Sequence, residues 1–322
     1  MKSIEEYRIA LEEEIRKIEF PGGKFESLYS PIQYALSAGG KRIRPVLAMM
    51  SADAFGDKAE IALLPAIGLE IFHNFTLIHD DVMDKSDMRR GRLTVHKKYN
   101  ENTAILSGDT MLTLATQYIT KVDSPILKNV IDTFNDMAIK VYEGQQLDMD
   151  FENETRISTE EYLQMIQYKT GALLGACAKI GALIGGASDK DADKMYEFGM
   201  QTGVAFQIQD DWLDTFGDAS TFGKNIGGDI NNAKKTYLYV SALEKDGQMA
   251  DALREAYKIP AGDIRVKTVT RIYEKLGINE SAKKSVNQYS SLALKALNST
   301  SLSDEKKEVF RKLAEKLIGR KK

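Results

Sequence analysis

Two clusters of aspartates have the spacing that could support chemistry in this sequence. Each cluster spells D-D-x-x-D and follows an apolar run, and their first aspartates lie 130 residues apart (210 − 80). On a helix, the first and last aspartates of a cluster fall one turn apart on the same face, where like charges repel. Burial beside apolar residues raises this cost, so a cation must compensate. The aspartates are Asp80, Asp81, Asp84, Asp210, Asp211 and Asp214.

Magnesium is the cation that this pattern favours. Mg²⁺ prefers oxygen ligands and usually takes one or two carboxylates together with substrate phosphates. Two such helix faces, opposed across a cavity, would hold several Mg²⁺ ions that bridge a diphosphate. A solvated acidic helix end is the alternative for one cluster alone, and the repeated spacing argues against it. An EF-hand is not supported, because neither cluster has the loop glycine and the closing glutamate.

Basic residues that could bind phosphate precede the first aspartate cluster and follow both clusters. The segment 39–45, G-G-K-R-I-R-P, places three cations beside glycines, where a backbone can approach a ligand closely. Arg89 and Arg90 follow the first aspartate cluster, and Lys224 and Lys234 flank a glycine-containing loop after the second. Arginine binds phosphate oxygens in bidentate fashion, and lysine supplies a point charge. The aspartates could hold metal ions on one diphosphate, and the basic residues could bind a second diphosphate without metal. Together they predict a site for two phosphorylated substrates.

The histidines do not predict a zinc site. His73 and His79 are six residues apart and do not share a helix face, and His96 is the only other histidine. His73 lies two helical turns before Asp80. It could donate a hydrogen bond to the phosphate pocket or be a core histidine, and the sequence leaves both interpretations open.

Composition excludes several other classes of protein. The 44 basic and 47 acidic residues give a net charge of −3, which argues against a nucleic-acid binder. Cys177 is the only cysteine, which excludes an intrachain disulfide and favours a reducing cytoplasm. Residues 1–8 lack the apolar core of a signal peptide, and the apolar run 171–187 is interrupted by Lys179 and too short to span a bilayer. We expect a soluble, cytoplasmic protein.

The pattern of apolar residues predicts helices along almost the whole chain. Only six prolines occur, and strict alternation is scarce, so strands are not expected. Ser158 and Glu161 have the spacing of a capping box and predict a helix start. The run 171–187 predicts a buried core helix. Breaks are expected at residues 21–23, 55–57, 85–102 and 216–228.

Together these residues resemble the trans-isoprenyl diphosphate synthase (polyprenyl synthetase) family, over about residues 31–235. The D-D-x-x-D clusters are similar to its two aspartate-rich motifs, and segment 39–45 to its isopentenyl diphosphate signature. The resemblance implies that isopentenyl diphosphate is bound by Lys41, Arg44, His73 and Arg90. It implies that the allylic diphosphate is bound by Arg89, Lys169, Lys224 and Lys234. Gln145 and Asp148 match the family's G-Q-x-x-D helix, and the residues that match its reaction centre are Lys169, Thr170, Phe206 and Gln207. The basic end, Arg320, Lys321 and Lys322, is similar to tails that close over the site.

The resemblance also implies a fold and a metal content. The expected fold is all-α, a single large antiparallel helical bundle around a deep central cavity that spans residues 1–322 as one domain, usually in a homodimer. Three Mg²⁺ ions are expected in each active site. Asp80, Asp84 and Asp210 would coordinate them, and the supporting carboxylates would be Asp81, Asp148, Asp211 and Asp214.

The implied reaction joins isopentenyl diphosphate head to tail with an allylic diphosphate. Ionisation of the allylic substrate, condensation and loss of a proton follow one another, and Lys169, Thr170 and Gln207 would face the cation. Terpenoid cyclases and head-to-head synthases are less compatible alternatives, because they do not need segment 39–45. A non-catalytic partner subunit is a third alternative, although such subunits usually lose one aspartate cluster and this chain has both.

Phe75 and Phe72 are expected to limit the length of the product, and we call them the chain-length floor. Phe75 lies five residues before Asp80, or roughly 7–8 Å along a helix at ~1.5 Å per residue. A single aromatic residue at this position is similar to the geranylgeranyl (C20) type of the family, with the farnesyl (C15) type as the alternative. For an isolated F-x-x-F pair, simple core packing would be the better interpretation.

Overall fold

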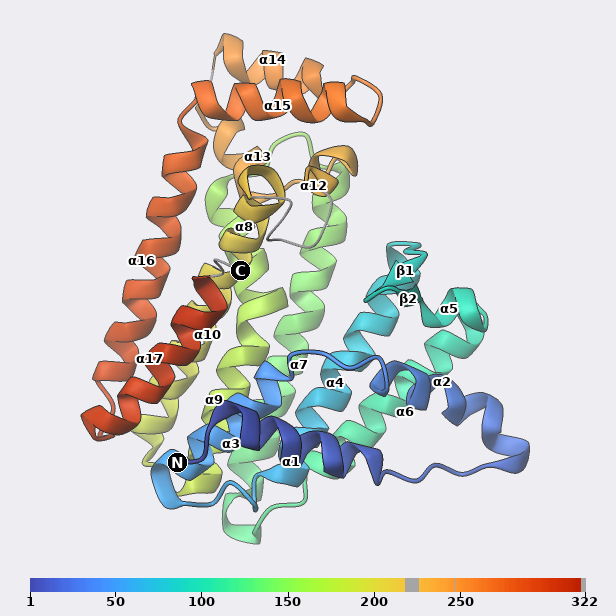
Figure 1. Cartoon of the computed structure of the whole chain (residues 1–322), viewed down its shortest axis with the longest axis vertical. Coiled ribbons are helices and arrows are strands. Elements are labelled where there is room, and N and C mark those ends of the chain that lie inside the picture. Colours follow the sequence, from blue (N-terminus) through green and yellow to red (C-terminus); the bar gives the residue numbers. More distant parts are fainter. Residues whose placement is uncertain (218–225, 246, 320–322) are drawn as a thin grey trace. The chain divides into compact units, whose positions relative to one another are not determined.

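The structure is a computed structural model, and it describes residues 1–217, 226–245 and 247–319. Helices make up almost all of its regular structure (Figure 1), which confirms the predicted all-α class. The chain divides into two compact units, and the expectation of a single domain over residues 1–322 stays a prediction. Three helices contribute residues to both units: α7 (Ser124–Asn153), α9 (Ala172–Gly185) and α10 (Asp189–Phe216).

The first unit comprises residues 1–134 and 177–192. Its central helix, α4, packs against α3 and α6, and α1 packs against α3 and α4 (Figure 1). Phe72 and Leu69 of α4 and Tyr7 and Leu11 of α1 are fully buried in its core. The elements that lie wholly in this unit are α1 (Ile4–Arg16), η1 (Gly23–Phe25), α2 (Glu26–Leu36), α3 (Ile43–Gly56), α4 (Leu63–Met83), β1 (Met88–Arg89), β2 (Arg92–Leu93), α5 (Val95–Lys98) and α6 (Glu101–Ile119).

A short hairpin is the one departure from the expected all-helical pattern among the described residues. Strands β1 and β2 pair antiparallel, with Met88 opposite Leu93 and Arg89 opposite Arg92. Arg90 and Gly91 form the turn in left-handed conformations, with φ of 52° and 72°. Such residues are typical of a two-residue hairpin turn. The expectation of no strands was wrong here because a strand of two residues is too short to produce a periodic pattern.

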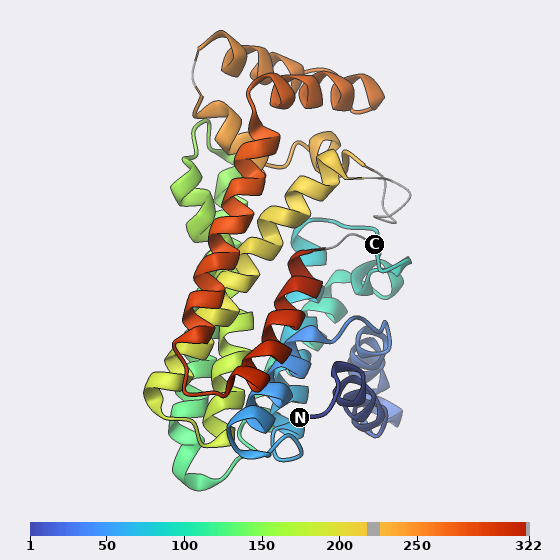
Figure 2. The same cartoon turned by 60° about the vertical axis from the view of Figure 1, so that its left-hand side comes forward.

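The second unit comprises residues 135–176 and 193–322. Helices α16 and α17 pack against each other within it (Figure 2). Helix α8 begins at a capping box formed by Ser158 and Glu161, as predicted. The described elements that lie wholly in this unit are α8 (Thr159–Ile166), η2 (Gln167–Gly171), α12 (Gly228–Asn231), α13 (Tyr237–Leu243), α14 (Gln248–Ala256), α15 (Asp263–Lys275), α16 (Ile278–Asn298) and α17 (Asp304–Ile318).

Several predicted boundaries coincide with those of the structure. Helix α3 ends at Gly56, where Asp57 takes a left-handed conformation, and α10 ends at Phe216. The apolar run 171–187 becomes the core helix α9, in which Cys177 and Ile180 are fully buried. Within the described part of the chain, no helix is both long enough and apolar enough to cross a membrane.

Candidate functional site

The first aspartate motif lies at the carboxyl end of α4. Asp81 is buried and accepts hydrogen bonds from Arg89 Nε on both carboxylate oxygens, at 2.8 and 2.9 Å. Burial raises the pKa of Asp81, and the charge of Arg89 opposes that shift. Asp80 is partly exposed and Asp84, which caps the helix, is exposed. The second aspartate of the motif, Asp81, therefore holds Arg89, while the outer two, Asp80 and Asp84, are accessible to a metal ion.

The second motif repeats this division of roles on α10. Asp211 is buried and accepts hydrogen bonds from the Tyr162 hydroxyl at 2.5 Å, the Tyr237 backbone N–H at 2.9 Å and Gln207 Nε2 at 3.1 Å. Burial, followed by the charge of Asp229, raises the pKa of Asp211 to about 7, against the effect of these donors.

The outer aspartates of the second motif lie nearer the surface. Asp210 and Asp214 are partly exposed, and Asp214 Oδ2 accepts a hydrogen bond from the Asp229 backbone N–H at 2.9 Å. Helix geometry explains the shared pattern, because the second position of D-D-x-x-D points about 100° away from the first, whereas the fifth returns to the same face.

Basic side chains of the first unit form a cluster around His73. Arg44 Nη1 lies 3.2 Å from His73 Nε2, so the imidazole accepts this hydrogen bond. Burial, and then the charges of Arg44, Arg90, Arg89 and Arg42, hold the pKa of His73 well below its usual range. His73 is therefore a neutral acceptor. Arg44 Nε is buried and has no hydrogen-bond partner among the described residues, which leaves a donor available to an anion.

Two further predicted ligands lie near segment 39–45. Lys41 is exposed, and Arg90 Nη1 donates to the carbonyl of Gly39. Arg90 also lines a small pocket with Asp81, Arg89 and Asn74. The structure thus brings together Arg44 with His73, and Arg90 with the loop that contains Lys41.

The predicted reaction-centre residues of the second unit converge on η2. This segment is a π-helix, whose extra residue per turn shifts the positions of Lys169 and Thr170, and such turns are frequent at functional sites. Lys169 Nζ lies 2.5 Å from Asp148 Oδ2 of α7. Thr170 Oγ1 donates to Gln207 Oε1 at 3.3 Å. The Gln207 amide is therefore held at both ends, because its Nε2 donates to Asp211.

Helix α7 reaches η2 through a glycine. A Cβ atom on Gly144 would collide with the backbone of Lys169, so only glycine permits this approach. The next residue, Gln145, has its side-chain nitrogen and oxygen buried without a hydrogen-bond partner in the described part of the chain. A buried amide in this state is unusual and is suited to receiving a polar ligand. Phe206, which precedes Gln207, is partly buried.

The two phenylalanines predicted to limit product length, Phe75 and Phe72, pack against other aromatic rings. Phe75 contacts His79 and Phe72, with ring centroids 4.8 and 5.6 Å apart, and Phe72 contacts Phe134 of α7 at 5.3 Å. Phe72 is fully buried and Phe75 is 6% exposed. The rings of His79, Phe75 and Phe72 on α4 and of Phe134 on α7 are thus linked by successive ring contacts, and we call them the row of aromatic rings.

Some expected site residues have no described role. Lys224 and the terminal Arg320, Lys321 and Lys322 lie outside the described residues. Lys234 is exposed after α12, and its described hydrogen bond is from its backbone N–H to Asp229 O.

The sequence did not reveal the roles of Arg42, Glu12, Glu70 and Tyr162. Arg42 was grouped with the phosphate-binding cations, but it is buried and ion-paired to both glutamates. No local pattern could reveal these partners, since Glu12 and Glu70 lie 30 and 28 residues from Arg42 and Tyr162 lies 49 residues from Asp211.

The carboxylates suit Mg²⁺ in chemistry and exposure. Among the described residues, no three acidic, histidine or cysteine side chains lie close enough together to form a complete metal cage. Mg²⁺ does not require such a cage, because it normally completes its coordination with water and substrate phosphates. Accessible oxygen donors one helical turn apart, as in Asp80 and Asp84, fit that mode of binding.

Comparisons with known proteins identify the family. The Polyprenyl synthetase family model matches residues 25–276. The chain is 42% identical over 222 residues to the geranylgeranyl diphosphate synthase of Methanosarcina mazei, covering 68% of each chain. It is 37% identical to that of Sulfolobus acidocaldarius, covering 93% of each. It is 41% identical to the farnesyl diphosphate synthase of Micrococcus luteus, covering 71% of this chain and 81% of the relative.

Solved structures show the same similarity. A crystal structure of geranylgeranyl pyrophosphate synthase matches with a TM-score of 0.94 at 39% identity, covering all of both chains. The Corynebacterium glutamicum geranylgeranyl pyrophosphate synthase, complexed with isoprenyl diphosphate and magnesium, matches with a TM-score of 0.86 at 28% identity, covering 99% of this chain and 98% of the other. The chain therefore belongs to the polyprenyl synthetase family and is a trans-isoprenyl diphosphate synthase.

Proposed function

We propose that this enzyme makes geranylgeranyl diphosphate (C20) by head-to-tail condensation of isopentenyl diphosphate with shorter allylic diphosphates. Isopentenyl diphosphate is bound by Lys41, Arg44, His73 and Arg90. The allylic diphosphate is bound by Arg89, Lys169, Lys224 and Lys234.

The assignment of isopentenyl diphosphate rests on the cluster around His73. A buried arginine nitrogen without a partner is costly, and a diphosphate oxygen would satisfy it. Because His73 is neutral and accepts from Arg44, it orients the guanidinium without neutralising its charge. The carboxylate near this cluster, Glu70, is ion-paired with Arg42. The cluster therefore keeps positive charge for an anionic ligand.

Mg²⁺ is the proposed cofactor, with three ions expected. Asp80, Asp84, Asp210 and Asp214 would hold it, since these carboxylates are at least partly exposed. When bound, the metal neutralises charge on the leaving diphosphate. Asp81 and Asp211 act instead through Arg89 and Gln207, which they hold in place. Asp148 holds Lys169.

The side chains of the chain contribute binding, orientation and exclusion of water. In the reaction, the bond between C1 and the diphosphate oxygen breaks, and the double bond of isopentenyl diphosphate forms a new carbon–carbon bond at C1. The departing diphosphate accepts the proton that is then lost, so no side chain is required as a base. The Thr170 and Gln207 oxygens, which are linked to each other, offer dipoles to the cation.

The row of aromatic rings is the observation that supports a C20 product. Phe75 lies roughly 7–8 Å along α4 from Asp80, at ~1.5 Å per residue. Its contacts with Phe72 and His79 restrict movement of the ring, and Phe134 packs against Phe72. A chain growing along this side of α4 would stop at a firm barrier. Relatives that make geranylgeranyl diphosphate agree with C20, and the Micrococcus luteus relative favours C15 as the second candidate.

Product analysis tests this proposal. The enzyme is incubated with dimethylallyl diphosphate, labelled isopentenyl diphosphate and Mg²⁺, and the dephosphorylated products are separated by chain length. We expect C20 to accumulate, with C15 as a transient intermediate that farnesyl diphosphate can replace as primer. Accumulation of C15 would identify a farnesyl diphosphate synthase, and absence of any elongated product would refute the proposed reaction.

A further inference from the structure

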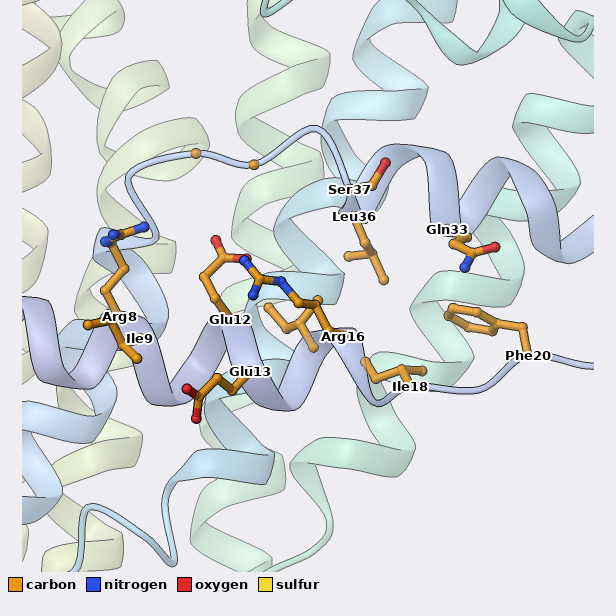
Figure 3. A pocket seen from close by; sticks show the side chains of 13 residues that line it. Arg8, Ile9, Glu12, Glu13, Arg16, Ile18, Phe20, Gln33, Leu36 and Ser37 are labelled. Atoms are coloured by element: carbon orange, nitrogen blue, oxygen red, sulfur yellow. The ribbon is translucent and has the colours of Figure 1, made fainter.

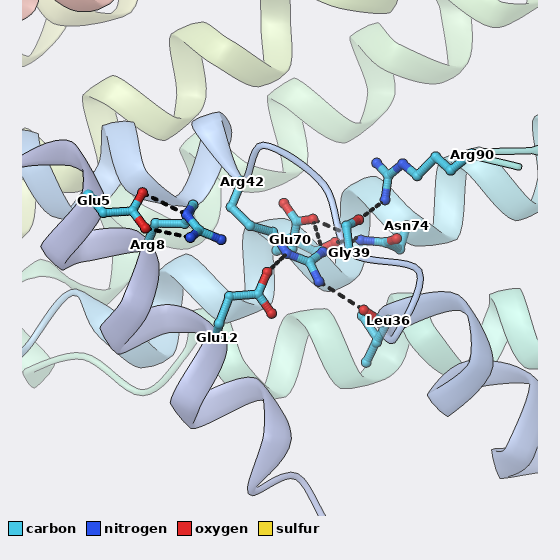
Figure 4. A network of polar contacts seen from close by, with 9 residues as sticks. All are labelled: Glu5, Arg8, Glu12, Leu36, Gly39, Arg42, Glu70, Asn74 and Arg90. Atoms are coloured by element: carbon cyan, nitrogen blue, oxygen red, sulfur yellow. Dashed lines mark hydrogen bonds and ion pairs between the residues drawn. The ribbon is translucent and has the colours of Figure 1, made fainter.

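Arg42 lies between two proposed ligands of isopentenyl diphosphate but points away from solvent. Its side chain is 1% exposed, whereas its neighbour Lys41 is exposed. The guanidinium is bound on three sides (Figure 4). Nε donates to Glu12 of α1 at 2.8 Å, Nη1 to Glu70 of α4 at 2.5 Å, and Nη2 to the carbonyl of Leu36 at 2.8 Å.

These three contacts stabilise an unfavourable backbone conformation. Arg42 has φ of 50° and ψ of 30°, in the left-handed region that residues with a Cβ atom rarely adopt. Helix α3 begins at the next residue, Ile43. The conformation of Arg42 therefore determines the direction in which the loop enters α3. It thereby sets how Lys41 and Arg44, on either side, are presented.

The other end of the loop is held by Arg90. Its Nη1 donates to the carbonyl of Gly39, and a Cβ atom on Gly40 would lie 3.1 Å from that nitrogen. Gly40 has φ of 147°, a conformation that favours glycine. The loop is thus fixed at Gly39 and at Arg42, and Lys41 lies between the two fixed points.

A groove separates the same loop from helix α1. It has a volume of about 530 Å³, and its lining includes Glu12, Glu13 and Arg16 of α1 together with Gly39 and Gly40 (Figure 3). Because this space lies between them, α1 does not pack closely against the glycines. The ion pair between Glu12 and Arg42 is a direct link from α1 to the end of the loop.

We propose that Arg42 is a positioning residue, held by Glu12 and Glu70, that orients Lys41 and Arg44 for binding of isopentenyl diphosphate. Helix α1 thereby contributes to the affinity for this substrate without touching it. The proposal relies on the proposed function only for the identity of the bound diphosphate.

Glu12 is the best position at which to test this link. Its side chain is 16% exposed, against 3% for Glu70, so its charge can be removed with less disturbance of the core. Glu12→Gln retains the shape and an acceptor oxygen but loses the ionic component of the contact. The loop should then occupy several conformations, and only those that present both cations correctly would bind isopentenyl diphosphate.

Steady-state kinetics with each substrate varied in turn give the readout. For Glu12→Gln we expect KM for isopentenyl diphosphate to rise about ten-fold, equivalent to about 1.4 kcal/mol. KM for the allylic substrate and kcat should change by less than about two-fold, because only uniform binding of one substrate is lost. Glu13→Gln is the matched control, since Glu13 is an exposed residue on the same helix and in the same groove, and it should behave as the wild type.

Two further variants separate positioning from general loosening. Arg42→Lys keeps the charge but cannot make all three contacts, so an intermediate rise in the same KM is expected. Leu253→Ala, in the core of the second unit, lowers stability without touching the loop and should leave the ratio of the two KM values unchanged. An unchanged KM in Glu12→Gln, or an equal rise for both substrates, would overturn the proposal.

Direct binding distinguishes failure of this inference from failure of the proposed function. Calorimetric titration of isopentenyl diphosphate into metal-free enzyme requires no turnover. If the wild type binds this ligand and Glu12→Gln binds it about ten-fold more weakly, the inference stands even if the product differs from C20. Equal affinity of the two proteins would refute the inference and leave the proposed function intact, whereas absence of binding to the wild type would refute the binding of isopentenyl diphosphate on which both depend.

Discussion

His73 should make the stability of the protein sensitive to moderate acid. Its pKa is held well below the usual value, first by burial and then by the charges of Arg44, Arg90, Arg89 and Arg42. In the unfolded chain the imidazole regains an ordinary pKa of about 6.5. Below that pH the unfolded state binds a proton that the folded state does not, so the free energy of unfolding decreases as the pH falls.

The size of this effect follows from the same difference. For each pH unit below about 6.5 the free energy of unfolding decreases by about 1.4 kcal/mol, until the pH reaches the pKa of the folded state. Between pH 8.0 and pH 5.5 the free energy of unfolding of the wild type should therefore fall through His73, by at most about 1.4 kcal/mol. His73→Gln removes this loss, because glutamine does not titrate and its side-chain oxygen can still accept from Arg44.

Urea unfolding at both pH values measures the effect. The quantity to compare is the change in the free energy of unfolding between pH 8.0 and pH 5.5, since other groups also titrate in this range. His79→Gln is the matched control, because His79 contacts the carbonyl of Ile105 and lies outside the arginine cluster. Equal pH dependence in the wild type and His73→Gln would refute the assignment of a neutral His73.

Four other substitutions test separate parts of the site. Tyr162→Phe removes a donor to the buried Asp211 carboxylate, so the free energy of unfolding in urea should fall by about 1–3 kcal/mol and kcat should also fall. Unchanged stability would contradict the described hydrogen bond. Phe75→Ala should lengthen the products seen by chromatography, because large-to-small changes leave space when neighbours relax only partly, and an unchanged distribution would place the floor elsewhere. Arg44→Ala should raise KM for isopentenyl diphosphate more than KM for the allylic substrate, while Lys224→Ala should do the reverse. Equal effects on both substrates would show that the division of the basic residues is wrong.

Features encoded by local spacing could be predicted from the sequence. The capping box at Ser158 and Glu161 needs only three residues of separation, and α8 begins there. The D-D-x-x-D spacing places Asp80 and Asp84 on one helical face wherever the helix lies. The resemblance to the family then identified Arg44 and His73, which contact each other in the structure.

Features that depend on tertiary contacts could not be predicted. In the sequence, Arg42 is indistinguishable from the other cations of its basic segment. Its pairing with Glu12 and Glu70 could not be predicted because it requires three separate helices to meet. The π-helix η2 shifts the register of Lys169 and Thr170, and a regular helical period cannot anticipate this shift. The roles of Asp81 and Asp211 likewise depend on which partners fold against them.

Both aspartate motifs are expected to support one metal-dependent condensation. The most direct test is the initial rate of incorporation of labelled isopentenyl diphosphate by wild type, Asp80→Ala and Asp210→Ala, each with excess Mg²⁺ and with excess EDTA. The wild type should be active only with Mg²⁺, and each variant should lose several orders of magnitude in rate while its helical content, measured by circular dichroism, is retained. Near-normal activity of either variant, or full wild-type activity in EDTA, would contradict the claim.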